Sequence, residues 1–161
     1  LSQPWAGRLA DPRQSAPFCY SDSALNSLDS DNADFSDGPA VGASAPSVRL
    51  DDRYLHEYLD TRPTIIWFEN ANAISALPAL RQTIEEHNIH IIIVSLDGTS
   101  DVDQAGFTFI NDKNSIFAQA WDATAGTWYL LRPDWHVCAR TKADTEMKKL
   151  GEAIERMYGH A

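Results

Sequence analysis

Two continuous apolar runs constrain the fold of this chain most strongly. Thr64–Phe68 and His90–Leu96 are rich in β-branched residues and show no alternation of apolar with polar side chains. Such runs are typical of strands that are covered on both faces. A helix is predicted between them, with Ser75 suited to the N-cap and Pro78 to the first turn. Its buried stripe is expected to comprise Ala76, Leu77, Leu80, Ile84 and His87. Strand, helix and strand in this order predict a parallel βαβ unit.

A second pair of apolar runs predicts a β-hairpin near the end of the chain. Trp128–Leu131 and Trp135–Ala139 flank Pro133 and Asp134, two residues that favour a turn. Hairpin strands are antiparallel, so a sheet that contains both this hairpin and the βαβ unit is mixed.

Short elements complete the pattern. Helices are predicted over Asp112–Trp121 and from near Asp144 to just before Gly159, an edge strand over Val48–Leu50, and one or two helical turns over Arg53–Leu59. The side chains expected to face the core are Leu55, Tyr58, Leu59, Ile116, Phe117, Ala120, Met147, Leu150, Ile154 and Met157. The order β-α-β-α-β-β-α, after a short first strand, predicts an α/β fold of thioredoxin-like type over residues 39–161, with three layers around a mixed sheet.

Residues 1–38 have a different composition. Aspartate, serine, asparagine and proline dominate, and apolar residues are sparse and without a lasting period. Such a segment cannot bury enough apolar surface to offset chain entropy, so we expect a linker or an extended arm. Trp5, Phe18 and Tyr20 are exceptions, which we expect to dock either on a partner or back onto the domain.

Composition excludes several classes of function. The formal net charge of −10 disfavours contact with nucleic acid or with an anionic membrane. No apolar run approaches the roughly 18 residues needed to span a bilayer. Leu1–Ala10 lacks the basic start and apolar stretch of a signal peptide, and two distant cysteines are no disulfide framework. These features favour a cytoplasmic, reducing compartment.

Several motifs together resemble one family. Gly42-Ala43-Ser44-Ala45-Pro46 is similar to the Gly-x-x-Ala-Pro segment that opens many thioredoxin- and peroxiredoxin-like domains. Leu131-Arg132-Pro133-Asp134-x-His136-Val137-x-x-Arg140 resembles the closing motif in the C-terminal domain of FAD-dependent aromatic-ring hydroxylases, the flavoprotein monooxygenases of phenol-hydroxylase type. Ser15-Ala16-Pro17-Phe18 and Tyr20-Ser21-Asp22-Ser23 resemble the segment that joins the catalytic body to that domain. Trp135 departs from the motif, which often has a smaller or polar residue there.

The resemblance implies an accessory role. The parent family uses FAD and NAD(P)H to place one oxygen atom on a phenolic ring, and its C-terminal domain packs on the flavin domain without holding the cofactor. This chain lacks the Gly-x-Gly-x-x-Gly fingerprint of a dinucleotide site, and neither Gly98 nor Gly106 fits one. We therefore expect no catalytic, cofactor-binding or metal-binding residue here. The implied partners are upstream flavin-binding and substrate domains, or a second copy across a dimer contact.

The redox site of a thioredoxin is missing from the sequence. Such a site needs a thiolate at the start of the helix that follows the first central strand. That position is Glu69-Asn70-Ala71-Asn72-Ala73-Ile74-Ser75, which contains no sulfur, and no proline stands between Trp121 and Leu130 before the third central strand. Both thioredoxin and peroxiredoxin chemistry are therefore disfavoured.

For the other candidate sites, a structural role explains the residues better than a catalytic or metal-binding role. His136 and Cys138 are two apart on a predicted strand, ~7 Å, too far for direct proton transfer. A buried cysteine and an exposed Cys19 are the simpler expectations. His87 with His90 lacks a third metal ligand. The acidic residues that follow a predicted strand lack the alternation and the closing glutamate of a calcium loop; they are Asp97, Asp101 and Asp103.

The aromatic residues suggest a contact surface. Trp121 and Trp135 lie near the ends of predicted elements, and half-exposed tryptophans often anchor protein interfaces. Three hypotheses remain for the whole chain. It is a non-catalytic domain that braces a flavin monooxygenase, a stand-alone redox-inactive binding module, or an active thiol oxidoreductase, in decreasing order of support.

Overall fold

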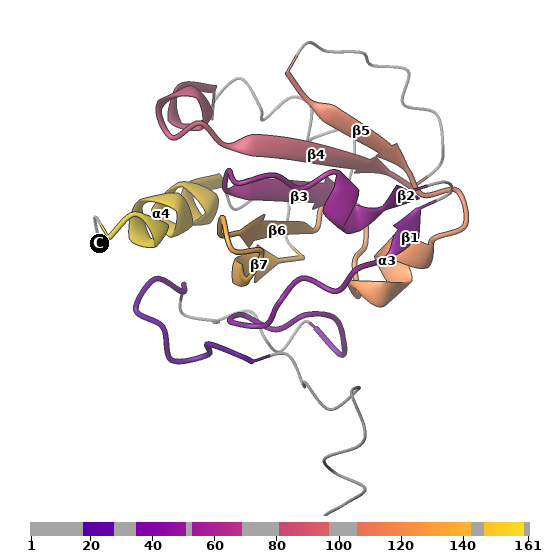
Figure 1. Ribbon diagram of the computed structural model, residues 1–161, viewed down its shortest axis with the longest axis horizontal. Coiled ribbons are helices and arrows are strands. Elements are labelled where there is room, and N and C mark those ends of the chain that lie inside the picture. Colours follow the sequence, from indigo (N-terminus) through magenta and orange to yellow (C-terminus); the bar gives the residue numbers. More distant parts are fainter. Residues whose placement is uncertain are drawn as a thin grey trace, which may run out of the picture.

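A five-stranded mixed sheet forms the centre of the computed structural model, which describes residues 18–27, 35–50, 53–68, 81–96, 106–142 and 147–159. The strand order is β5-β4-β3-β6-β7 (Figure 1). β3 pairs in parallel with β4 and antiparallel with β6, so the predicted βαβ unit and the mixed sheet are confirmed. The bounds are β3 Thr64–Phe68, β4 His90–Ser95, β5 Thr108–Asn111, β6 Trp128–Leu131 and β7 Val137–Thr141.

Apolar side chains on both faces of the sheet create a three-layer thioredoxin-like fold, as the sequence predicted. One face packs against α4 (Met147–Met157) and Ile84, which lies in the helical stretch of residues 81–86. The other packs against α3 (Ile116–Ala120) and the segment that leads into β3. Leu150, Ile154 and Met157 point into the core as expected. Ser75 and Pro78 lie outside the described residues.

β5 was not predicted from the sequence. It pairs in parallel with β4 at the edge of the sheet, with Phe109 opposite Ile93. The strand is short, and only Ile110 of its residues is fully buried. A half-exposed edge strand of four residues gives a weak periodic signal, because only one of its residues is buried.

Three other expectations were wrong in detail. Val48–Leu50 does not join the central sheet, because β1 (Arg49–Leu50) pairs with β2 (Arg53–Tyr54) in a separate two-stranded sheet, followed by a 3₁₀ turn, η3 (Leu55–Glu57). The helix predicted from Asp112 begins only at Ile116, because the Asp112 carboxylate accepts hydrogen bonds from the Phe117 and Ala118 amides, 3.1 and 2.8 Å away. Ile116 and Ala120 are consequently exposed.

The hairpin turn shifts the second strand of the hairpin. Trp135 N donates to Arg132 O at 2.8 Å, and Arg132 N donates to His136 O at 2.9 Å. Trp135 adopts φ 64°, the left-handed conformation that closes a three-residue hairpin loop. β7 therefore begins at Val137 rather than at Trp135. Of the residues described, no helix is both long and apolar enough to cross a bilayer.

Candidate functional site

The described parts of the sequence motifs that carried the family resemblance meet at one place; Ser15-Ala16-Pro17 lies outside the described residues. Residues 42–45 lie beside the hairpin and extend its backbone hydrogen bonding. Gly42 N donates to Val137 O at 2.7 Å, Val137 N donates to Ala43 O at 2.9 Å, and Ala45 N donates to Trp135 O at 2.8 Å. This segment covers an edge of the sheet that would otherwise expose unpaired backbone groups. We call the contact of residues 18–27 and 35–45 with the hairpin and with the α3–β6 connection the arm junction.

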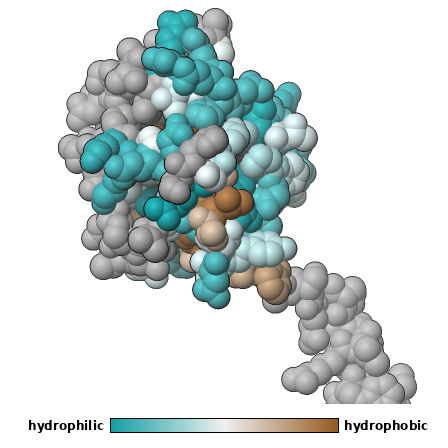
Figure 2. Space-filling model, turned by 90° about the vertical axis from the view of Figure 1, so that its left-hand side faces the viewer, coloured by the Kyte–Doolittle hydropathy of each residue, from teal (hydrophilic) through white to brown (hydrophobic). Residues whose placement is uncertain are grey.

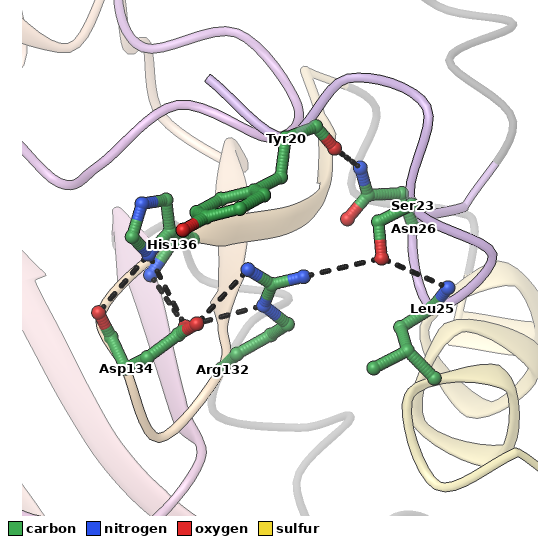
Figure 3. Close-up of polar contacts among 7 residues, drawn as sticks. All are labelled: Tyr20, Ser23, Leu25, Asn26, Arg132, Asp134 and His136. Atoms are coloured by element: carbon green, nitrogen blue, oxygen red, sulfur yellow. Dashed lines mark hydrogen bonds and ion pairs between the residues drawn. The ribbon is translucent and has the colours of Figure 1, made fainter. Parts of the chain in front are cut away.

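Arg132 and Asp134 stabilise the hairpin and connect it to the arm. The buried Arg132 guanidinium donates from Nε and Nη2 to the Asp134 carboxylate, 3.2 and 3.0 Å away, and from Nη1 to Ser23 Oγ at 3.4 Å (Figure 3). Partial burial of Asp134 would raise its pKa, but the Arg132 hydrogen bonds and the His136 amide lower it below the usual range. The ion pair therefore holds the turn in one geometry, with one guanidinium nitrogen left for the arm.

Tyr20 packs back onto the hairpin. Its amide donates to Gly42 O at 2.8 Å, and its ring lies edge-on to His136, with 4.9 Å between ring centroids. The Arg132 guanidinium stands 5.6 Å from the same ring (Figure 3). Asn26 Nδ2 donates to Tyr20 O at 2.7 Å, and Ser27 N donates to Cys138 O at 2.8 Å. This part of the arm is therefore bound to the domain along its length.

Phe35 is a second anchor of the arm. Its ring is buried in the core beneath the Arg140 guanidinium at 4.2 Å and beside Lys142 Nζ at 4.9 Å. Arg140 Nη1 also donates to Pro39 O at 3.0 Å. Arg140, the last residue of the hairpin motif, thus binds the arm through a cation–π contact and a hydrogen bond.

Asp122 binds the arm from the α3–β6 connection. Its carboxylate accepts hydrogen bonds from the amides of Ser36 and Asp37, at 2.7 and 3.0 Å, and pairs with Lys142 at 3.0 Å. Burial would raise the pKa of Asp122, but these three partners lower it to about 2. The carboxylate is therefore charged in the folded chain at any pH above that value.

Replacing Asp122 should weaken the arm junction in a pH-dependent way. The folded pKa of about 2 lies below the ordinary value of 3.8, so the charge stabilises the fold above pH 4 and this contribution is lost as the pH falls to 2. Asp122→Asn keeps an acceptor oxygen and tolerates φ 48°, so we expect a loss of about 1 kcal/mol at pH 7. Urea unfolding from pH 7 to pH 2 measures it.

The matched control is Asp22→Asn, because Asp22 is exposed and accepts a hydrogen bond from the hydroxyl of its chain neighbour Ser21, at 3.5 Å. It should change the stability by less than about 0.5 kcal/mol. A difference between Asp122→Asn and the natural chain that persists unchanged at pH 2 would contradict a role for the Asp122 charge.

The two cysteines occupy different environments. Cys19 is exposed, as expected, and its thiol points to Val41 O at 3.9 Å. Cys138 is fully buried on the α4 side of the sheet, and burial raises the pKa of its thiol to about 12. Such a thiol is not a nucleophile at neutral pH. Glu69–Ser75, where a redox helix would begin, lies outside the described residues.

Thiol labelling tests this difference between the cysteines. At pH 8 a thiol with a pKa of about 12 is ionised in roughly one molecule in 10,000. The native chain should therefore take up one equivalent of a thiol reagent, at Cys19, and a second only after denaturation. Cys19→Ser should abolish the native labelling, and rapid uptake of two labels by the folded chain would contradict a buried Cys138.

The two histidine candidates lie apart from each other's partners in the described structure. His87 stacks on Tyr158 and contacts Glu155 at 3.3 Å, whereas His90 hydrogen-bonds Thr108 at 2.8 Å and has its pKa lowered by burial. Within the described residues, no three His, Cys, Asp or Glu side chains gather as a metal site would require. The aspartates between residues 97 and 103 lie outside these ranges, as does Trp5.

The two candidate contact tryptophans differ. Trp121 is fully buried between Phe117 and Tyr129, so its expected role as a surface anchor was wrong. Trp121 comes directly after the short helix α3. A position at the end of a predicted element gives no clear sign of burial, so the sequence did not identify Trp121 as a core residue. Trp135 is 39% exposed, and its Nε1 donates to Asp60 O at 3.0 Å.

A hollow of about 550 Å³ lies between Leu96, just after β4, and the α3–β6 connection. Its polar lining residues are Ser115, Gln119, Asp122 and Thr124. Asp122 is already bound to the arm, and the lining contains neither histidine nor cysteine. The hollow therefore offers no nucleophile paired with a base.

Sequence reasoning missed two residues of the arm junction. Phe35 is a single aromatic residue among polar and aspartate residues, and this isolated position was the one sequence feature that could have indicated an anchor. Asp122 gave no signal, because its partners Ser36 and Asp37 are about 85 positions away.

Comparison with known proteins supports the fold. No family model and no curated protein sequence matches the chain. Among solved structures, the flavin-dependent monooxygenase PieE is similar with a TM-score of 0.58 and 16% identity, over 92% of this chain and 25% of that one. The rebeccamycin biosynthetic enzyme RebC gives a TM-score of 0.56 and 14% identity, over 86% and 22%. This chain thus spans about a quarter of these two proteins.

Other solved structures match as well. A 2-Cys peroxiredoxin of Plasmodium vivax is similar with a TM-score of 0.56 and 13% identity, over 74% of this chain and 97% of that one. A thioredoxin-like protein of Bacteroides caccae has a TM-score of 0.51 and 17% identity, over 73% and 50%. At such low identities the shared property is the fold, and that fold is thioredoxin-like.

Proposed function

We propose that this chain is a non-catalytic C-terminal domain of an FAD-dependent monooxygenase that acts on aromatic rings, where it braces the flavin-binding and substrate domains. The observation that carries the proposal is the extent of the structural matches. Residues 39–161 make up about three-quarters of the chain. Matches to the two monooxygenases cover 86–92% of it and so include part of the arm, whereas the peroxiredoxin match covers 74%.

The arm junction supports the same proposal. Residues 18–27 are held by the hairpin motif, whose polar side chains Arg132 and Arg140 contact Ser23 and Pro39. Domains that are joined by a free linker move relative to each other, and fixing the connecting segment to one domain limits this motion. The chain also has no dinucleotide-binding glycine turn, and the net charge of −10 is unfavourable for a pyrophosphate. FAD and NAD(P)H would therefore be bound upstream.

Flavin binding separates this proposal from its alternatives. The purified 161-residue chain should neither retain FAD on gel filtration nor oxidise NAD(P)H, whereas the product of the complete reading frame should do both. Tight FAD binding by this chain alone would contradict the division of labour. A reading frame with its own start codon close to Leu1 would favour a stand-alone binding module instead.

A further inference from the structure

Large exposed apolar side chains concentrate in one short segment of the arm. Phe18 is 68% exposed, Tyr20 45% and Leu25 39%. These are three of the seven large exposed apolar residues in the described structure, although residues 18–27 are only a small part of it. The Phe18 and Tyr20 rings touch, with 4.8 Å between centroids. Where it is coloured, the side of the molecule drawn in Figure 2 is largely hydrophilic, with hydrophobic residues only in small patches.

The backbone beneath these side chains is fixed. Ser23 N donates to Tyr20 O at 3.1 Å and Asn26 N donates to Ser23 O at 3.0 Å, forming two successive turns. The Asn26 side chain donates a hydrogen bond back to Tyr20 O across these turns, and Ser27 N donates to Cys138 O in β7. Exposed aromatic groups on an already ordered backbone lose little conformational entropy on binding, which favours them as interface anchors.

The order of the domains along the polypeptide favours one partner. Under the proposed function the flavin-binding body precedes this chain, so it is covalently joined to the segment that carries these side chains. A tethered partner has a high effective concentration at this surface. A second copy of the chain would instead bring another net charge of −10 against the first.

We propose that Phe18, Tyr20 and Leu25 form the surface on which the flavin-binding body of the same polypeptide packs. This inference rests on the proposed function and adds the contact face to it. The arm then has two sides: Tyr20 and Asn26 hold the domain, and Phe18 with Leu25 faces the body.

Side-chain footprinting of the complete flavoprotein tests the contact without any substitution. Hydroxyl-radical labelling of Phe18 and Tyr20 should fall by about fivefold relative to the isolated chain, as expected for groups at a buried interface. Labelling of Ile116, which is 50% exposed on α3 at the other side of the domain (Figure 1), should not change. Equal labelling of Phe18 in both proteins would overturn the proposal.

A double variant gives a second, independent measurement. In the complete flavoprotein, Phe18→Ser with Leu25→Ser should make proteolytic release of the domain about tenfold faster, because release follows the population of the undocked state. Ile116→Ser is the matched control and should leave the rate within about twofold. The isolated double variant should unfold within about 2 °C of the natural chain, since both side chains are already exposed.

The outcomes distinguish the two proposals. A complete product that binds no flavin would remove the proposed function and this inference with it. A flavoprotein in which the double variant behaves like Ile116→Ser would overturn only the contact face. Dimerisation of the isolated chain that Phe18→Ser abolishes would assign the surface to a second copy and would also overturn the inference.

Discussion

Gly42→Ala is expected to lower the free energy of unfolding by about 3–4 kcal/mol and to detach the first part of the arm. Gly42 has φ 87°, and a Cβ built on it would lie 2.5 Å from both Ser21 N and Tyr20 C. Because these are backbone atoms, no side-chain rotation relieves the collision. The left-handed conformation costs an alanine about 1–2 kcal/mol, and each hydrogen bond lost between residues 20 and 42 or 42 and 137 adds about 1 kcal/mol.

Two other glycines separate the collision from the backbone strain. Gly106 has φ 106°, but no heavy atom lies within 4 Å of a Cβ placed there, so Gly106→Ala should cost only the strain, about 1–2 kcal/mol. Gly151 lies inside α4 in open space, and Gly151→Ala should stabilise the chain by up to about 1 kcal/mol. Urea unfolding compares the three variants. Equal decreases in the free energy of unfolding for Gly42→Ala and Gly106→Ala would mean that residues 20 and 21 of the arm do not pack against Gly42.

The central sheet was predictable because its signals are local. Ile65–Phe68 and Ile91–Val94 are apolar at every position, and the structure buries all of them. A run of this kind has few alternatives to a doubly covered strand. The edge strand β5 and the pairing of β1 with β2 were missed because two to four half-exposed residues carry too little pattern.

The arm junction was visible only in part. The hairpin motif and the Gly42–Pro46 segment were both recognised, but what they do depends on contacts between distant residues. Arg132 meets Ser23 across 109 positions, and Arg140 meets Pro39 across 101. A polar composition predicted a linker or an extended arm, and Phe35 with a few backbone hydrogen bonds suffices to bind its described parts to the domain. Composition reports the average burial of a segment and cannot identify single anchors.

Trp121→Ala is expected to cost about 4 kcal/mol, the largest effect of a single side chain considered for this protein. Trp121 is fully buried, and its ring lies edge-on to Tyr129 and Phe117, with centroids 4.8 and 5.3 Å away. Truncation would leave a large cavity beneath the sheet and remove two aromatic contacts. For a chain of this length, we expect the melting temperature to fall by roughly 10 °C.

Trp135→Ala is the matched control, because the sequence alone assigned both tryptophans to a protein contact. Trp135 is 39% exposed and contributes one hydrogen bond, to Asp60 O, so its truncation should cost about 1 kcal/mol. Thermal unfolding of both variants measures the difference. A surface anchor would give the opposite result at Trp121: nearly unchanged stability of the isolated chain, with weaker binding to its partner. Truncation of a half-exposed side chain does not cost as much as about 4 kcal/mol. A loss of that size would therefore establish Trp121 as part of the core, which holds the α3–β6 connection and Asp122 in place.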